Sequence, residues 1–184
     1  PGTEAKKLAR QTMAQLLPFV DLVIGNEGDA ADVLGIQPTA TDVEQGHINV
    51  QAYEDVARQI VSQYANVSRV AITLRESVSA DFNRWGAMLY EAAGDQAWFA
   101  PLDNGAYQPY EIRDIVDRVG AGDSFAAGLL HALHSESHSE PGKAIAFAVA
   151  ASCLKHSVAG DFNFVSESEV SALVGGNATG RVQR

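Results

Sequence analysis

The sequence is poor in cysteine and in basic residues. Cys153 is its one cysteine, so no internal disulfide can form, and 13 Lys and Arg against 23 Asp and Glu give a net charge of −10. Nucleic acids and anionic membranes both require a basic protein face, so we expect neither as a partner. Cys153 lies in an apolar run, which predicts a buried thiol in a reducing, cytoplasmic compartment.

Long apolar segments are also missing. The sequence has no run of about 18 apolar residues, so we expect no membrane-spanning helix. Its first residues, PGTEAKKLARQTMAQLL, contain neither the apolar centre of a signal peptide nor an initiator methionine, which favours a chain with something upstream of it. A length of 184 residues is enough for one hydrophobic core and predicts a single domain over residues 1–184.

Two common phosphate-binding motifs are absent as well. A dinucleotide fingerprint needs a third glycine three residues after the Gly-Ala-Gly at 120–122, and Phe125 stands there. A Walker loop needs Gly-Lys followed by Ser or Thr, whereas the Gly-Lys at 142–143 is followed by Ala144. Any phosphate site in this chain must therefore be built differently.

What the sequence does have is an alternation of strand and helix patterns. The expected strands span 19–26 and 68–74, with a hairpin from 84–92 and 96–101, and residues 39–50 are expected to be loop. The expected helices span 3–17, 27–34, 49–65, 121–134 and 141–156, the last rich in alanine and able to approach a neighbour closely. Ser166 and Glu169 form the capping box of a final helix. The pattern predicts an α/β domain with a largely parallel sheet covered on both faces.

The segment DRVGAGDSFAAGLL combines a glycine-rich loop with an acidic residue at the start of an apolar helix. Gly120 and Gly122 permit close approach of a ligand to the backbone, and the first amides of the helix lack partners. Together with Ala121 they would form a backbone site for an anion. Asp123 beside that site would accept a proton, an arrangement that suits phosphoryl transfer. A plain turn into a helix capped by Asp123 is the alternative.

The same segment resembles the second signature of the ribokinase-like (PfkB) carbohydrate kinases. VIGNEGDAADVLG, VAITLRES and AIAFAVAASCLKHSVAGDFN resemble further segments of that family in the same order. ITLRESVSAD, YEIRDIVDRVGAGDSFAAGLLHAL, CLKHSVAGDFN and the terminal GRVQR are more similar still to bacterial 2-keto-3-deoxygluconate kinases. The resemblance implies a three-layer α/β/α fold with a mostly parallel sheet, of which the chain matches the C-terminal half, without the N-terminal half and its β lid.

The resemblance also implies roles for individual residues. Asp123 would be the catalytic base, and Gly120, Ala121 and Gly122 the anion hole. Asn26 and Asp29 would help to hold Mg²⁺ through water, and Asp117 would belong to the site of a monovalent cation such as K⁺. The remaining implied contacts are those of Thr73 and Arg75 with the nucleotide phosphates, Phe147 and Ala150 with the adenine, and Asp161 with a hydroxyl of the sugar.

Two of these positions depart from the family pattern, and several have simpler interpretations. Asp29 replaces the usual glutamate, which is one methylene longer, and Arg75 stands where many relatives have glycine. Helix caps or surface acids are the alternative for Asp29, Asp117 and Asp161. The histidines near the polar segment HSESHSEPG are assigned to a solvated loop and not to a metal site.

The implied activity is ATP-dependent phosphorylation of a small sugar acid, 2-keto-3-deoxygluconate, by the protein to which this chain belongs. We expect these 184 residues alone to be inactive or nearly so, because positioning of the acceptor and exclusion of water need the missing half. A ribokinase or fructokinase activity, or a non-catalytic nucleotide-binding module, is the alternative. The expected partners are ATP and the sugar acid, and a homo-oligomer is left open.

Overall fold

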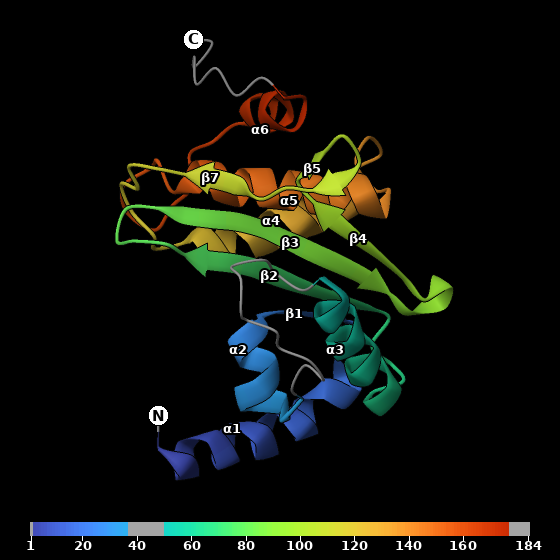
Figure 1. Ribbon diagram of the computed structural model, residues 1–184. Helices are drawn as coiled ribbons and strands as arrows, with labels where there is room; N and C mark the ends of the chain where they lie inside the picture. The colour runs from blue at the N-terminus through green and yellow to red at the C-terminus, as the bar shows by residue number, and fades with distance from the viewer. Residues whose placement is uncertain (1, 37–49, 177–184) are drawn as a thin grey trace. The chain divides into compact units, whose positions relative to one another are not determined.

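The computed structural model describes residues 2–36 and 50–176, which form two compact units (Figure 1). Unit 1 comprises Pro1–Leu74 and Met88–Ala97, and unit 2 comprises Arg75–Ala87 and Trp98–Arg184. The loop expected at 39–50, except for its last residue, and the terminal GRVQR lie outside the described residues. The single domain expected from chain length stays a prediction. Within the described ranges, no helix combines the length and the apolar character needed to span a bilayer.

Five strands form one mixed sheet in the order β1-β2-β3-β4, with β7 paired to β3. Their bounds are β1 (Leu22–Asn26), β2 (Arg69–Ser77), β3 (Asn83–Glu91), β4 (Gln96–Ala100) and β7 (Tyr110–Ile112). β1 and β2 are parallel, with Asn26 opposite Thr73, whereas β3 and β7 are antiparallel. The expected hairpin is confirmed, since β3 and β4 are neighbours joined by a short turn. β5 (Leu102–Asp103) and β6 (Ala106–Tyr107) form a separate antiparallel ribbon.

Unit 1 contains helices α1 (Thr3–Leu16), α2 (Glu27–Asp29) and α3 (Val50–Gln63), with a π-helical turn at Ala30–Leu34 continuing α2. α3 buries a stripe at helical spacing, Ala52, Val56, Ala57 and Ile60, as its sequence pattern predicts. α1 buries no residue, although its apolar residues recur at the expected spacing. An apolar cavity of about 600 Å³ lies between α1 and the strands β1 and β2.

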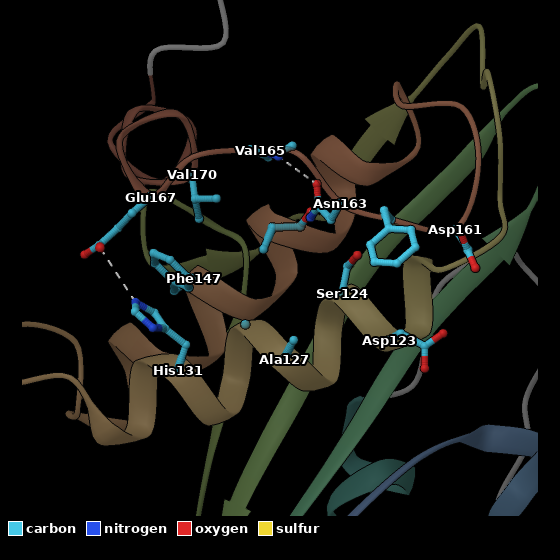
Figure 2. A pocket seen from close by; sticks show the side chains of 13 residues that line it. Asp123, Ser124, Ala127, His131, Phe147, Asp161, Asn163, Val165, Glu167 and Val170 are labelled. Carbon is cyan, nitrogen blue, oxygen red and sulfur yellow. Dashed lines mark hydrogen bonds and ion pairs between the residues drawn. The ribbon is translucent and has the colours of Figure 1, made fainter.

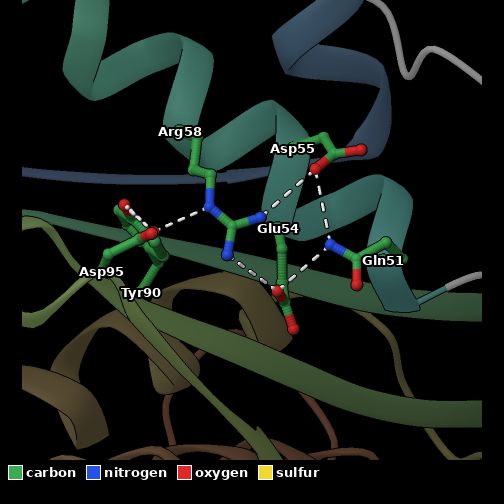
Figure 3. A network of polar contacts seen from close by, with 6 residues as sticks. All are labelled: Gln51, Glu54, Asp55, Arg58, Tyr90 and Asp95. Carbon is green, nitrogen blue, oxygen red and sulfur yellow. Dashed lines mark hydrogen bonds and ion pairs between the residues drawn. The ribbon is translucent and has the colours of Figure 1, made fainter.

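A polar network fastens α3 to the turn after β3 (Figure 3). Arg58 contacts Glu54 and Asp55 on its own helix, and its Nε donates to Asp95 Oδ1 at 2.7 Å. The hydroxyl of Tyr90 donates to the same oxygen at 2.9 Å. The guanidinium of Arg58, followed by the Tyr90 hydroxyl, lowers the pKa of Asp95. All the charged groups are exposed enough for water to screen them, so the network orients side chains more than it stabilises the fold.

Unit 2 contains helices α4 (Ala121–His134), α5 (Pro141–Lys155) and α6 (Glu167–Val174). α4 and α5 pack closely: a Cβ added at Gly128 would lie 3.2 Å from both Ala148 Cα and Ala151 Cβ. The close approach expected of the alanine-rich helix is thus confirmed. The buried hydroxyl of Ser152 donates to the carbonyl of Ala121 at 2.7 Å, which ties α5 to the first turn of α4. The capping box at the start of α6 is also confirmed. Cys153, which was expected to be buried, is only partly buried.

Candidate active site

Asp117 joins two loops of unit 2. Its Oδ1 accepts the amide N–H of Val119 at 3.0 Å, and its Oδ2 accepts that of Gly160 at 2.9 Å. These bonds, that of Val119 first, lower the pKa of the Asp117 carboxyl. The side chain therefore holds the loop before α4 against the loop after α5. This bridge gives Asp117 a structural role, and its predicted role in a cation site stays a prediction.

Gly120 is the N-cap of α4 and has left-handed backbone angles, φ 78° and ψ 0°. A Cβ at this position would lie 2.1 Å from the carbonyl oxygen of Asp161. Both the backbone angles and this contact exclude any side chain. The main chain at Asp161 is thereby brought against the start of α4.

The start of α4 leaves two amides unpaired. Ser124 N donates to Gly120 O at 2.8 Å, and Ala121 N makes a longer bond to Arg118 O at 3.4 Å. The N–H groups of Gly122 and Asp123 have no acceptor within the described ranges. The Asp123 side chain is exposed and likewise has no partner there. The predicted anion hole and base stay predictions, and the geometry leaves both sets of atoms available for a ligand.

Arg118, the second residue of the DRVGAGD motif, anchors the loop from the other side. Its Nη2 donates to the carbonyls of Ser79 and Ala80 at 2.9 and 2.8 Å and lies 3.2 Å from Asn83 Oδ1. Ser79 and Ala80 belong to the turn between β2 and β3, and Asn83 is the first residue of β3. Sequence reasoning assigned no role to Arg118, although its place inside the motif was a usable signal.

A cavity of about 590 Å³ opens beside Asp123 (Figure 2). Three of the predicted site residues line it: Asp123, Asp161 and Phe147. Ala150 is fully buried in α5 and does not line the cavity, whereas the adjacent Ala151 does. The lining residues that sequence reasoning did not assign include Ser124, His131, Ala151, Phe162, Asn163 and Glu167.

The end of the cavity away from Asp123 is aromatic. The ring of Phe147 lies between those of His131 and His138, at centroid distances of 5.4 and 5.0 Å. Both imidazoles approach the Glu167 carboxylate, at 3.7 Å for His131 Nε2 and 4.0 Å for His138 Nδ1. Phe162, which follows Asp161 in the chain, lines another part of the cavity with a ring that is 70% exposed. Apolar and aromatic walls with a few polar groups are typical of a pocket for a planar ligand.

Unit 1 holds a separate cluster of predicted residues. Asn26 Oδ1 accepts the amides of Gly28 and Asp29 at 2.8 and 3.1 Å, and Asp29 Oδ2 accepts the amide of Asn26 at 2.9 Å. This is a capping box at the start of α2. Thr73, opposite Asn26 in the register, contacts Gly25 O at 3.5 Å. Asn26 is the carboxyl end of β1, Asp29 follows in α2, and Thr73 lies opposite Asn26 in β2. The carboxyl ends of parallel strands are where α/β sheets commonly bind ligands.

The chemistry of this cluster fits Mg²⁺ held through water. Asp29 Oδ1 has no partner within the described residues, whereas Oδ2 and Asn26 Oδ1 are engaged by amides. In residues 2–36 and 50–176 no three His, Cys, Asp or Glu side chains are grouped to hold a metal. Mg²⁺ does not need such a cage, because it keeps several waters and binds through one or two carboxylates and substrate phosphates.

Arg75 lies in the part of β2 that belongs to unit 2. Its side chain is exposed, and it makes no hydrogen bond or ion pair within the described ranges. A guanidinium in this state is free to form bidentate contacts with a phosphate group. The predicted phosphate contact therefore has a side chain available for it.

Comparison with known proteins places this geometry in a family. Residues 87–175 match the pfkB family carbohydrate kinase model. The structure of 2-dehydro-3-deoxygluconokinase from Thermotoga maritima is 40% identical with a TM-score of 0.77, covering 92% of this chain and 46% of that chain. A PfkB family carbohydrate kinase from Listeria grayi is 28% identical with a TM-score of 0.73, covering 92% and 46%. A comparison with curated proteins gave no match.

More distant structures share the fold. Ribokinase from Thermotoga maritima is 18% identical with a TM-score of 0.54, and the match covers 88% of this chain and 44% of that chain. The chain thus spans about half the length of the structures it resembles, and the ribokinase-like α/β fold expected from sequence is confirmed. Through residues 87–175, the chain is a member of the PfkB family of carbohydrate kinases.

Proposed function

We propose that the chain is the nucleotide-binding and catalytic part of an ATP-dependent kinase that phosphorylates 2-keto-3-deoxygluconate. One observation carries the proposal: the exposed carboxylate of Asp123 lies beside the amides of Gly122 and Asp123, and none of the three has a partner among the described residues. A turn with a structural cap would engage the carboxylate with those amides. A phosphoryl-transfer site needs both groups free for the reactants.

In the proposed reaction a hydroxyl oxygen of the sugar acid attacks the γ-phosphorus of ATP. The new P–O bond forms as the bond between the γ-phosphorus and the bridging oxygen breaks, and ADP leaves with that bridging oxygen. Asp123 takes the proton of the attacking hydroxyl, and the amides of Gly122 and Asp123 stabilise the charge on the transferring phosphoryl oxygens. Mg²⁺, when bound, would neutralise further charge on the phosphate oxygens. Asn26 and Asp29 are the residues that would hold it.

The nucleotide and the sugar are assigned to different parts of the cavity. Phe147, which is nearly buried, and Ala151 line an apolar part of the cavity, and we assign the adenine to this part. Asp161, near Asp123 in Figure 2, is an acceptor for a hydroxyl of the sugar. The choice of 2-keto-3-deoxygluconate is supported by the relative that is 40% identical and named a 2-dehydro-3-deoxygluconokinase.

The test is the ATP-dependent phosphorylation of 2-keto-3-deoxygluconate by the full-length product of the gene. Ribose and fructose serve as competing acceptors, and ADP release is measured for all three. Replacement Asp123→Asn removes the base and is nearly isosteric, so kcat should fall by about 10²–10⁴-fold with little change in ATP affinity. Glu136→Gln, in the polar turn after α4, is the matched control and should leave kcat unchanged.

Two outcomes would contradict the proposal. If none of the three sugars is phosphorylated at saturating concentration, the chain does not belong to an active kinase of this kind. If turnover survives Asp123→Asn, the carboxylate is not the base. ATP binding without turnover in the wild-type protein would favour the non-catalytic nucleotide-binding module instead.

A further inference from the structure

Two serines are buried in α4 and α5, and they differ in their hydrogen bonds. Ser152 on α5 is 0% exposed, and its hydroxyl donates to the carbonyl of Ala121 at 2.7 Å. Ser124 on α4 is 7% exposed, lines the cavity beside Asp123, and its hydroxyl has no partner among the described residues. A largely buried hydroxyl without a partner is destabilising, so the position of Ser124 needs an explanation.

The helix itself offers Ser124 an acceptor that its hydroxyl does not use. A serine inside a helix commonly donates its hydroxyl to the carbonyl four residues earlier. For Ser124 that carbonyl is Gly120 O, which accepts the Ser124 amide at 2.8 Å. The hydroxyl instead points away from α4 into the cavity of about 590 Å³ (Figure 2). Its partner is therefore to be sought among the groups that a ligand brings into this cavity.

The cavity follows one face of α4. The residues of α4 behind Asp123 that line it have the spacing i, i+3, i+4 and i+7: Ser124, Ala127, Gly128 and His131. The seven residues from Ser124 to His131 correspond to about 10 Å along the helix axis. The ring of Phe147 lies at the His131 end, and the amides of Gly122 and Asp123 lie at the Ser124 end. This arrangement suits an elongated ligand with one planar and one anionic end.

The hydroxyl of Ser124 belongs to the anionic end. In a helix each Cα–Cβ bond tilts toward the N-terminus, so the Ser124 side chain leans toward the amides of Gly122 and Asp123. Those amides have no acceptor within the described residues either. Three donors, two amides and one hydroxyl, are thus grouped at the start of α4. Adjacent phosphate groups of one nucleotide would supply adjacent acceptors for them.

We propose that the Ser124 hydroxyl donates a hydrogen bond to the β-phosphate of the nucleotide, next to the γ-phosphate that the amides of Gly122 and Asp123 hold. This inference rests on the proposed kinase function and adds a residue that touches the leaving group. As the bond between the γ-phosphorus and the bridging oxygen breaks, negative charge grows on the β-phosphate, and this hydrogen bond strengthens. The hydroxyl keeps its own proton throughout.

The first experiment measures nucleotide binding without turnover. The full-length protein is titrated calorimetrically with ADP and with AMP, which has no β-phosphate. Ser124→Ala should weaken ADP binding by about tenfold or more and AMP binding by less than about twofold, because a hydrogen bond to a charged group is lost only with ADP. An equal loss for both nucleotides would assign the hydroxyl to the ribose or the base. Unchanged binding of both would show that it meets only water, and either result would overturn the proposal.

The second experiment compares the two buried serines in the absence of nucleotide. Ser124→Ala removes a hydroxyl that has no partner in the described structure and introduces a better helix former, so Tm should stay the same or rise. Ser152→Ala, the matched control, breaks the bond to Ala121 O and should lower Tm by about 2 °C or more. If Ser124→Ala lowers Tm as much as Ser152→Ala, or fails to fold, the Ser124 hydroxyl serves the fold and not a ligand.

The third measurement is the rate of phosphorylation. Ser124→Ala should lower kcat/KM for ATP by about tenfold or more, whereas Ser171→Ala, which changes an exposed serine on α6, should leave it unchanged. A wild-type rate in Ser124→Ala would overturn the proposal. If the wild-type protein phosphorylates no sugar, the kinase proposal fails, and the comparison of ADP with AMP still decides whether Ser124 binds the β-phosphate.

Discussion

The start of α2 in unit 1 and the start of α4 in unit 2 are both positions where the sequence predicts ligand binding, but they differ in what occupies their amides. At α2 the side chains of Asn26 and Asp29 form a complete capping box. At α4 the N-cap is Gly120, which has no side chain, and the amides of Gly122 and Asp123 stay unpaired within the described residues. One helix start is satisfied by the protein, and the other is left open.

The difference shows how a helix start can be tuned for a ligand. A capping box stabilises its helix locally and leaves few acceptors or donors for other partners. A glycine cap gives up that stabilisation, and the loop is instead held from outside by Asp117 and Arg118. Within the described residues the amides of Gly122 and Asp123 thus have no partner, while at α2 Asn26 Oδ1 and Asp29 Oδ2 are already engaged.

The largest effect on stability is expected from adding a methyl group at Gly120, the N-cap of α4. Gly120→Ala places an L side chain at positive φ and against the Asp161 carbonyl, so stability should fall by at least about 2 kcal/mol. Gly122→Ala meets no atom within 4 Å, and should raise stability by about 0.5–1 kcal/mol through helix propensity. Urea denaturation of both variants measures the contrast.

The same two variants test whether a phosphate of ATP binds at the start of α4. Gly122→Ala places a methyl group next to the free amide, so kcat/KM for ATP should fall although the protein is more stable. An unchanged kcat/KM in Gly122→Ala would mean that no phosphate approaches this amide. Equal stability of the two variants would contradict the backbone geometry at Gly120.

A smaller effect separates the two capping boxes. Asn26→Ala and Ser166→Ala each remove the cap of a short helix, and each should cost about 1 kcal/mol of stability. If Asn26 and Asp29 also hold Mg²⁺ through water, Asn26→Ala should in addition raise the Mg²⁺ concentration needed for half-maximal rate. Titration of the rate with Mg²⁺ in both variants measures this. If the rates of the Asn26→Ala and Ser166→Ala variants depend on Mg²⁺ in the same way, the Asn26–Asp29 pair serves only to cap α2.

The smallest effect is one of pH. The amides of Val119 and Gly160 lower the pKa of Asp117 below its ordinary value of 3.8. Its contribution to stability is therefore complete above pH 3.8 and is lost as the pH falls through the lower value of the folded state. Asp117→Asn should destabilise the protein clearly at pH 7 and less at pH 3. Urea denaturation at both pH values gives the difference, and a pH-independent difference would contradict it.

Most of the fold could be predicted because its signals are local. The apolar stripe of α3 and the capping box of Ser166 and Glu169 are readable over a few residues, and both are confirmed. β5, β6 and β7 were not predicted, because strands of two or three residues are too short to show alternation. Sequence likewise predicted the helix at 3–17 and could not show that α1 buries no residue.

The candidate site could be predicted where a sequence motif determines the backbone conformation. It was harder to predict where helix packing determines which side chains line the cavity. Gly120 and Asp123 follow from the loop pattern, but the choice between Ala150 and Ala151 depends on a rotation of about 100° around α5, set by packing on Gly128. Glu167 reaches the cavity from α6 without any periodic signal. The burial of Lys155 was not predicted, because lysine is rarely buried.

The contact between Gly120 and the main chain of Asp161 has a practical consequence for engineering. Since no atom can be inserted between them, the segment before α4 and the segment after α5 behave as one part. Attempts to change acceptor specificity by grafting residues 157–163 from a relative should transplant residues 117–123 from the same donor. A graft of either segment alone would misalign the surface that the two share.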